Sequence, residues 1–511
     1  MKQDIILLAA IMYKAQQIYW NIFHIDIVSK ITIASLALTI FRTNYYDPIK
    51  NPISIPNANV DSFIRRGYYG GHSDVYKPRG ENFFYYDVNS LYPYAMKQYP
   101  MPIGKAKWAT DLYKQNLDEL FGFIDACVIC PDYIKKPVLP RKDKDDLLIF
   151  GTGNFRGVYF SEEFKYAKSI GYDVTPLQGY LFEKGHGLFD KFVTELYYNR
   201  LKAKKDGNDG LSYVYKLLMN SLYGRFGINP VSTITEICSK VRYEQMLRQK
   251  GSFMFAEALG DEYFICSYCS DTLKSSDYVV PRIAAVHISA AISAYARIYM
   301  HPYINRDDSY YKDTDSVVLG SPLPEDVISK DELGKFQLVY KKVIEGIFLA
   351  AKSYYLTVER EDGQIVDVVT HKGAQKVYVN KEWFQEQYIN PSMTKMVVIR
   401  NNFRRDIKSL TINKLEYESI LAMPSSNKRE KVYDMDGVWV DTKSVQISTL
   451  SKEELVLINA YLYKIQIVVQ NKEQERTEQD ANDNQNGSNE KQNTDTEIGK
   501  KTLKNKQDKK V

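Results

Sequence analysis

The spacing of hydrophobic residues near the start of the chain predicts helices. Asp4 is a candidate cap of a first helix. A second amphipathic segment runs from about Ser29 to Arg42. Prolines between residues 47 and 57 then interrupt regular structure and indicate a boundary. In the first helix, apolar side chains recur every three or four positions, at Ile5, Leu8, Ile11, Met12 and Ala15.

An aromatic run, Phe83 to Tyr86, predicts a buried strand that ends in Asp87. The following residues, Val88 to Pro93, change to the pattern of a helix start. A carboxylate at the end of a central strand is well placed to face a cleft, and Tyr92 would form one wall of a small pocket. A helix-capping role for Asp87 is equally consistent with the sequence.

The next hundred residues mix two kinds of element and offer no candidate chemistry. Strand-like runs lie at 121–130 and 147–151, and a helix is predicted at 161–169. Residues 228–280 read as a β-rich, turn-rich insert, and 282–303 as a helix.

Two helices are predicted between Leu188 and Phe226, joined by a turn at Asp206–Gly210. The first helix ends in three lysines, at Lys202, Lys204 and Lys205. Four residues of the second helix share one face by their spacing: Lys216, Asn220, Tyr223 and Gly224. A cation, an amide, an aromatic ring and a residue without a side chain suit a triphosphate and a base. An ordinary solvated face is the alternative.

Two short β-prone runs between Ser309 and Gly320 meet at an acidic turn. Asp313, Thr314 and Asp315 lie at or near the tip of this predicted hairpin. Two carboxylates one residue apart can lie on the same side of an extended chain, where they would hold hard divalent cations. The alternative is that these are only the usual turn-forming residues.

Three further segments suit nucleic acid. Arg65 and Arg66 precede Tyr68, Gly70 and Gly71, which combine phosphate-binding cations, an aromatic surface and glycines that allow close approach. An ordinary glycine turn explains the same residues.

The other two segments place lysines beside aromatics or glycine. A strand is predicted at 351–356, which contains Lys352 and Tyr354, and residues 371–376 contain Lys372. Lysines in such places suit contacts with a nucleic-acid backbone, although neither segment is distinctive by itself.

Composition narrows the class of protein. With 511 residues, 44% hydrophobic and 26% charged, the chain has room for two or more domains and a sizeable core. The net charge of +5 permits a polyanionic partner, and 41 tyrosines supply stacking surfaces, which an AT-rich coding sequence would also produce.

Cysteines and apolar runs exclude several alternatives. Five cysteines, an odd number, argue against a disulfide framework and for a reducing compartment. The pairs Cys127/Cys130 and Cys266/Cys269 lie in strand-like runs, where side chains three apart point to opposite faces, so we expect no zinc. No secretory signal is present, and the apolar runs are too short to span a bilayer, so no membrane contact is expected.

Taken in order, these stretches closely resemble family B DNA polymerases of the protein-primed branch, found in phages and in linear plasmids of fungal and plant mitochondria. Asp87–Pro93 looks like motif A, Lys216–Gly224 like motif B, and Tyr311–Ser316 like motif C. Tyr68–Gly71 resembles the element that links exonuclease and polymerase domains, and Lys352–Tyr354 resembles the primer-contacting Lys-x-Tyr motif.

The resemblance implies a two-metal DNA polymerase. Asp87 and Asp315 would bind two magnesium ions, with manganese as an alternative, and Asp313 would support them. The implied nucleotide-binding residues are Tyr92, Lys204, Lys216, Asn220 and Tyr223, of which Tyr92 would exclude a ribose 2′-hydroxyl. The implied DNA-binding residues are Tyr68, Gly70, Gly71, Lys352, Tyr354 and Lys372. The implied partners are template-primer DNA, deoxynucleotides and a terminal protein that serves as primer.

The implied fold is an α+β right-hand polymerase, with palm, fingers and thumb, an antiparallel palm sheet and two inserted subdomains. Its expected parts are the end of an exonuclease domain (1–60), linker and first palm segment (61–104), first terminal-protein-region insertion (105–190), fingers (191–227), second insertion (228–280), palm (281–380), thumb and C-terminal part (381–470), and a disordered polar tail (471–511).

Only 67 residues precede Tyr68, and the first two exonuclease motifs are not among them, so we expect no 3′–5′ proofreading. The competing hypothesis is a catalytically silent remnant that binds DNA or the terminal protein. A polymerase that copies or makes RNA is disfavoured, since motif B and Tyr92 fit the DNA-making family. A mitochondrial location is expected from the linear-plasmid members.

Overall fold

The computed structural model describes residues 2–229, 233–248, 252–269, 280–281, 283–406, 409, 411–423, 428–456 and 458–460. Residues 1–449 form one compact unit and 450–511 a second. The fold described here is that of the first unit. The predicted polar tail, 471–511, lies outside the described residues.

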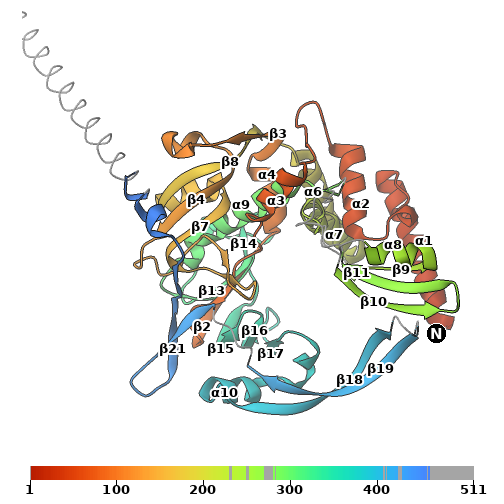
Figure 1. The fold of residues 1–511 in the computed structure, drawn as a ribbon. Coiled ribbons are helices and arrows are strands. Elements are labelled where there is room, and N and C mark those ends of the chain that lie inside the picture. The colour runs from red at the N-terminus through yellow and green to blue at the C-terminus, as the bar shows by residue number, and fades with distance from the viewer. Residues whose placement is uncertain are drawn as a thin grey trace, which may run out of the picture. The chain divides into compact units, whose positions relative to one another are not determined.

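Helices and antiparallel sheets occur together, which confirms the predicted α+β class (Figure 1). The α-helices of the described residues are α1 (Lys2–Phe23), α2 (Ile33–Ile40), α3 (Ala58–Arg65), α4 (Leu91–Gln98), α5 (Ser161–Ser169), α6 (Asp190–Lys205), α7 (Asp209–Phe226), α8 (Lys240–Arg248), α9 (Val286–Ile304) and α10 (Lys381–Ile389).

The largest sheet carries the predicted motifs A and C. Its strands follow the order β1-β12-β13-β2-β15-β16-β17, all antiparallel, and β14 pairs with β2. Their bounds are β1 (Ser73–Val75), β2 (Arg79–Val88), β12 (Ser309–Asp313), β13 (Ser316–Leu319), β14 (Phe336–Leu338), β15 (Lys342–Ala350), β16 (Ser353–Glu359) and β17 (Ile365–Thr370).

A second, five-stranded sheet follows the order β22-β7-β4-β8-β3. Four of its strands come from one stretch of sequence: β3 (Met101–Ala109), β4 (Gly122–Cys130), β7 (Thr152–Phe160) and β8 (Asp173–Gly185). The fifth, β22 (Gln446–Ser448), comes from near the end of the unit and pairs in parallel with β7. The C-terminal part of the unit thus returns to the sheet built from residues 101–185.

The remaining strands form small sheets. They are β5 (Arg141–Lys142) with β6 (Leu148–Ile149), the three-stranded β9 (Thr233–Ser239), β10 (Ser252–Leu259) and β11 (Tyr263–Cys269), the long ribbon of β18 (Thr394–Asp406) and β19 (Thr411–Ala422), and the hairpin of β20 (Arg429–Tyr433) and β21 (Trp439–Ser444).

Helix α9 lies at the centre of the packing. Every residue from Val286 to Arg297 is buried, as expected for a helix that is apolar on nearly all sides. Its side chains join the core that contains α2, α6 and α7 to the core under the largest sheet. The catalytic motifs predicted on α7 and on the sheet are therefore held by one shared support.

Most predicted elements are present, with local differences. The helix at 161–169 is confirmed as α5, and the helix predicted at 282–303 begins at Val286. The insert at 228–280 is β-rich as expected but also contains α8. Among the described residues, no helix is long and apolar enough to cross a membrane.

The predicted start of the strand at 351–356 is wrong, because the strand begins two residues later. Lys352 lies in the tight turn between β15 and β16 with a φ of +61°, and the strand begins at Ser353. Its local sequence is compatible with extended backbone, but the antiparallel pairing of β15 with β16 requires a reversal at this point.

Candidate active site

Asp87 and Asp315 are brought together by two neighbouring strands. Asp87 lies near the end of β2, and its partner across the ladder is Ser316, the first residue of β13. The backbone N–H of Val88 donates to the carbonyl of Asp315 at 2.8 Å. The alternative of a helix-capping Asp87 is wrong, since the residue at the N-cap of α4 is Ser90.

The environment of both carboxyl groups favours their protonated, neutral forms. Burial, together with the nearby Asp315, raises the pKa of Asp87 to about 7, although Lys216 acts in the opposite direction. Burial also raises the pKa of Asp315, and Asp313 adds to the rise while Lys352 opposes it. A cation bound beside the two carboxylates would stabilise their ionised forms.

Asp313 has a different environment from the other two. The ammonium of Lys352 lies 2.8 Å from both of its carboxylate oxygens. The backbone N–H of Lys352 also donates to the hydroxyl of Tyr311 at 2.9 Å. The charge of Asp313 is therefore already matched by an ion pair within the protein.

The segment that contains Gly71 packs against the acidic turn. Thr314, at the tip, has a φ of +55° and donates its N–H to the carbonyl of His72 at 2.8 Å. A Cβ atom at Gly71 would lie 2.7 Å from the Thr314 Oγ1 atom, too close for any other residue without a shift. Gly70 differs, because a Cβ there would meet nothing within 4 Å.

A buried ion pair that the sequence analysis missed holds the same segment. The guanidinium of Arg297, on α9, donates to both oxygens of Glu163, on α5, at 2.7 and 2.8 Å. It also donates to the carbonyls of Tyr69 and Gly70, each at 2.8 Å. The signal available in the sequence is a charged residue, Arg297, directly after the alanine-rich stretch 284–296.

A second missed cluster lies under the acidic turn. His72 contacts the carboxylate of Asp74 at 2.8 Å, and Lys428 lies 3.5 Å from the same carboxylate. Lys312, directly before Asp313, is buried, and burial with the nearby Arg297 lowers its pKa to about 7. The sequence shows these residues but not that the sheet encloses them.

The predicted face of α7 is accessible, which fits both a nucleotide-binding face and an ordinary solvated one. Lys216, Asn220 and Gly224 are exposed, and Tyr223 is partly buried. The ring of Tyr223 stacks on Tyr92 with centroids 4.2 Å apart. These two tyrosines therefore form a continuous aromatic surface between α4 and α7.

Tyr68 lies beside this surface. A Cβ atom at Gly227 would approach the Tyr68 ring to 2.6 Å, and the ring of Tyr68 therefore packs directly on that backbone. The hydroxyl of Ser289, on α9, donates to the carbonyl of Tyr223.

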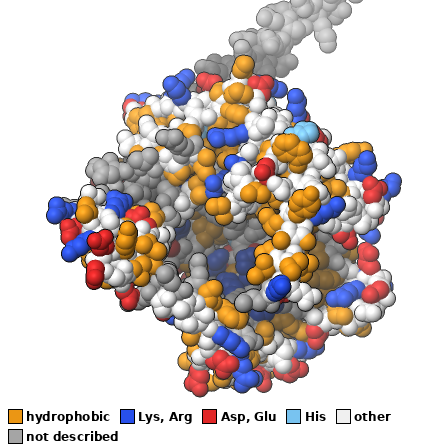
Figure 2. Space-filling model, turned by 90° about the vertical axis from the view of Figure 1, so that its right-hand side faces the viewer, with side chains coloured by type: hydrophobic (Ala, Val, Ile, Leu, Met, Phe, Trp, Pro, Cys, Tyr) orange, Lys and Arg blue, Asp and Glu red, His pale blue; other side chains and the backbone are white. Residues whose placement is uncertain are grey.

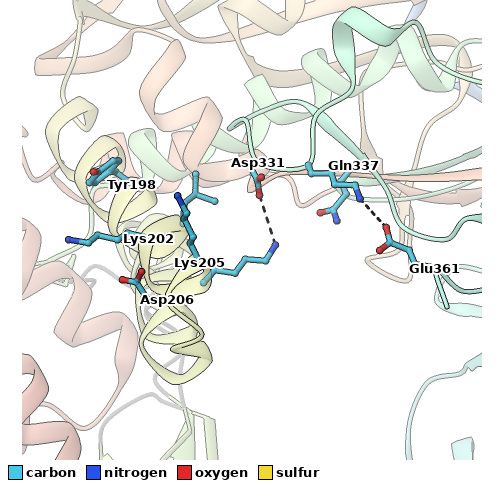
Figure 3. A pocket seen from close by; sticks show the side chains of 10 residues that line it. Tyr198, Lys202, Lys205, Asp206, Asp331, Gln337 and Glu361 are labelled. Carbon is cyan, nitrogen blue, oxygen red and sulfur yellow. Dashed lines mark hydrogen bonds and ion pairs between the residues drawn. The ribbon is translucent and has the colours of Figure 1, made fainter.

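Lys204 lines a cavity of 890 Å³ between the end of α6 and the largest sheet (Figure 3). Its ammonium lies 4.0 Å from Asp331, and Lys330 pairs with Glu361 at 3.1 Å. Gln337, also in the lining, is the ladder partner of Asp87. The cavity therefore reaches β14, the strand that pairs with β2 beside Asp87.

The other predicted DNA-binding residues are placed apart from one another. The hydroxyl of Tyr354 lies 3.4 Å from that of Tyr85, which is 3.4 Å from Ser316 beside the acidic turn. Lys372 is exposed in the segment after β17.

One face of the molecule is hollowed, and Lys or Arg side chains lie within the hollow (Figure 2).

Within the part of the chain that the structure describes, no three His, Cys, Asp or Glu side chains converge as a complete metal site. The protein's own share of a metal site would be the pair Asp87 and Asp315. Their raised pKa values, with carboxylate oxygens as the donor atoms, fit hard divalent cations that keep other oxygen ligands. The cysteine at 266 instead lies 3.6 Å from Cys238, sulfur to sulfur.

Comparison with known proteins gives matches over most of the chain. The family "DNA polymerase type B, organellar and viral" matches residues 1–310. A probable DNA polymerase of Podospora anserina is 31% identical over 492 residues, covering 89% of this chain and 39% of that protein. One of Neurospora intermedia is 32% identical over 402 residues, covering 74% of this chain and 39% of that protein. The chain thus spans about two fifths of the length of these relatives.

Phage proteins are similar as well. The DNA polymerase of Bacillus phage Nf is 27% identical over 356 residues, covering 64% of this chain and 55% of that protein. The solved structure of Phi29 DNA polymerase with primer-template DNA and incoming nucleotide has a TM-score of 0.58 at 17% identity, covering 78% of this chain and 68% of that chain. This likeness confirms the predicted polymerase fold. By its matched family and its relatives, the chain belongs to the organellar and viral type B DNA polymerases.

Proposed function

We propose that this chain is a DNA-directed DNA polymerase that adds deoxynucleotides to a primer 3′-hydroxyl. The observation that carries the proposal is the pair Asp87 and Asp315, held side by side by β2 and β13 with raised pKa values. Protein cores rarely keep two such carboxylates together unless a ligand uses them.

Asp87 and Asp315 would hold two magnesium ions, or manganese ions in their place. When bound, these ions supply the charge that favours ionisation of the primer 3′-hydroxyl and stabilises the leaving pyrophosphate. Asp313, paired with Lys352, fixes the position of the turn that carries Asp315.

The nucleotide would lie between α7 and the acidic site. Lys216, near enough to lower the pKa of Asp87, would contact the triphosphate, and Lys204 would add a second contact from its cavity. The stacked rings of Tyr92 and Tyr223 would border the new base pair, with Asn220 on the same exposed face. Tyr92 would there exclude a ribose 2′-hydroxyl.

The DNA would be held on both sides of this site. Tyr68, Gly70 and Gly71 would contact the template strand, and the open space around Gly70 leaves room for it. Tyr354, with Lys352, would contact the primer end, and Lys372 would contact the DNA backbone. Lys352 would have to exchange its ion pair with Asp313 for a primer phosphate.

Several finer points stay predictions. Priming by a terminal protein, replication of a linear plasmid, a mitochondrial location, the absence of proofreading and the proposed domain boundaries rest on the sequence resemblance. The second candidate function, a catalytically silent remnant that binds DNA, is disfavoured by the uncompensated carboxylate pair.

The test is extension of a primed DNA template with magnesium and deoxynucleotides. We expect extension by the wild-type protein and a loss of at least a hundredfold in Asp315→Ala, because the variant loses half of the metal-holding pair. Asp190→Ala, which changes an exposed carboxylate on α6, is the matched control. A folded wild-type protein that binds the template but adds no nucleotide would establish the remnant instead.

A further inference from the structure

A second polar pocket, of 620 Å³, lies at the end of β12 opposite to the acidic turn. Its lining comes from the loop that follows β4, the start of β12 and the hairpin of β20 and β21, and also from the turn after β1 and the first residues of β7 and β22. It is separate from the candidate active site, because Ser309 begins the strand that Asp313 ends.

Two buried cations line this pocket, and their hydrogen-bond partners are neutral oxygen atoms. Lys136 is 7% exposed and donates to the carbonyl of Arg306. Arg429 is 8% exposed and donates to hydroxyl and carbonyl oxygens, including Thr442 Oγ1 at 2.9 Å and the carbonyl of Lys135 at 3.0 Å. Among the described residues, no carboxylate lies within 4.0 Å of either cation as an ion-pair partner.

The two cations are close enough to repel each other. Both lie over the ring of Tyr76, with Lys136 Nζ 4.6 Å and Arg429 Cζ 5.0 Å from its centroid. Burial, and then Arg429 and Lys77, lower the pKa of Lys136 to about 7. Four carboxylates also line the pocket: Asp132, Asp307, Glu430 and Asp441. Asp307 pairs with Lys135 at 3.0 Å and Glu430 with Lys443 at 2.9 Å, while Asp307 and Asp441 act against the lowering of the Lys136 pKa. Buried like charges of this kind are costly unless an anion compensates them.

A third group in the lining also lacks a partner. The hydroxyl of Ser309 is fully buried and makes no hydrogen bond within the described part of the chain. An ammonium, a guanidinium and a free hydroxyl together match the several acceptor oxygens of a phosphate group. Lys77, also in the lining, adds positive charge, whereas the charge of Lys443 is matched by Glu430 at 2.9 Å.

We propose that this pocket is a second anion site, which binds a phosphate group carried either by a small molecule or by a nucleic-acid strand. Binding there would join the five-stranded sheet, β12 and the β20–β21 hairpin through one ligand. The role goes beyond nucleotide addition, since none of these groups belongs to the candidate active site.

The first experiment measures the melting temperature with millimolar inorganic phosphate against chloride at equal ionic strength. We expect a saturable rise in the wild-type protein. Lys136→Met keeps the length of the side chain and removes the buried charge, so it should melt higher than wild type without phosphate and show no saturable rise. Lys165→Met is the matched control, because Lys165 is partly buried but paired with Glu162 at 2.7 Å.

The second experiment distinguishes the two sources of the phosphate. The Kd for a single-stranded oligonucleotide is measured against salt concentration for the wild-type protein and Lys136→Met. A weaker Kd and a salt slope reduced by about one indicate a strand phosphate, whereas an unchanged Kd with a lost phosphate effect indicates a small molecule.

The proposal is overturned if the saturable phosphate effect is absent from the wild type or persists in Lys136→Met. Arg429→Gln provides a second variant, since its amide can keep hydrogen bonds to Thr442 or Ser444 while the charge is lost. If Lys136→Met does not fold, the same comparison with Arg429→Gln decides.

Discussion

At the scale of single residues, the three aspartates of the candidate site differ by their neighbours. Asp313 has a full ion pair with Lys352. The pKa of Asp87 is raised by burial and by Asp315, and that of Asp315 is raised by burial and by Asp313. The family resemblance already gives Asp313 a supporting role beside the two metal-holding aspartates. The structure adds the physical difference, because a lysine 39 positions away along the chain forms its ion pair with Asp313.

Asp87→Asn should stabilise the metal-free protein at high pH. The pKa of folded Asp87, about 7, is above the unfolded value of 3.8. The stability contributed by its proton is complete below pH 3.8 and is lost as the pH rises through 7. The advantage of the variant should thus grow from near zero at pH 4 to at most about 4 kcal/mol at pH 8.

Melting temperatures in chelator across this pH range measure the effect. Magnesium at pH 8 should raise the wild-type value and leave Asp87→Asn nearly unchanged. Asp190→Asn, an exposed carboxylate, is the control. If Asp87→Asn melted below wild type at pH 8 in chelator, ionised Asp87 would not be destabilising the metal-free protein.

At the scale of elements, the acidic turn depends on the segment that precedes β1. Gly71 touches Thr314, and Ser73 is the ladder partner of Asp313. The carbonyls of Tyr69 and Gly70 are in turn held by Arg297. The predicted template-binding segment is therefore also a structural support of the carboxylates.

Gly71→Ala should reduce both stability and extension, because its Cβ would overlap the Thr314 side chain. A loss of about 1–3 kcal/mol is typical of such overpacking. The second change Thr314→Gly removes the overlapping atoms and should restore the melting temperature. Gly70→Ala, which meets nothing within 4 Å, should melt like wild type. Equal losses in both alanine variants would show that sterics at Thr314 are not the cause.

At the scale of the whole first unit, β22 connects its C-terminal part to a sheet built about 300 residues earlier in the chain. Ile447 is buried in that sheet's core and lies against Gly151. The hydroxyl of Thr442, on β21, also donates to the carbonyls of Val75, the last residue of β1, and of Tyr76, which follows it. The segment after the β18–β19 ribbon therefore joins the two sheets.

Ile447→Ala should loosen this connection. Loss of a buried isoleucine side chain costs about 2–5 kcal/mol, through lost burial and the cavity left behind. Limited proteolysis should then cleave the segment after Ala422 faster than in wild type, with a lower melting temperature. Val440→Ala, at a position 42% exposed, should change neither by much. Unchanged proteolysis of Ile447→Ala would show that β22 does not hold the segment.

The candidate catalytic and binding residues and most helices and strands can be read from the sequence alone. Periodicity located α5 and α7, and the aromatic run located β2, since burial on one face imposes a repeat that can be read along the chain. Motif order gave the family and the fold, which the comparisons confirm. Asp87, Asp315 and Lys216 were named as functional on the same basis, and their roles stay predictions.

Which charged side chains contact one another depends on the three-dimensional fold. The pairing of Arg297 with Glu163, the enclosure of Lys312, and the return of β22 to β7 each join positions more than a hundred residues apart or depend on burial by such positions. Their free energies depend on desolvation and on partners across space, which local sequence does not encode. For the same reason, the sequence does not reveal that Lys136 and Arg429 lie close together in the second pocket.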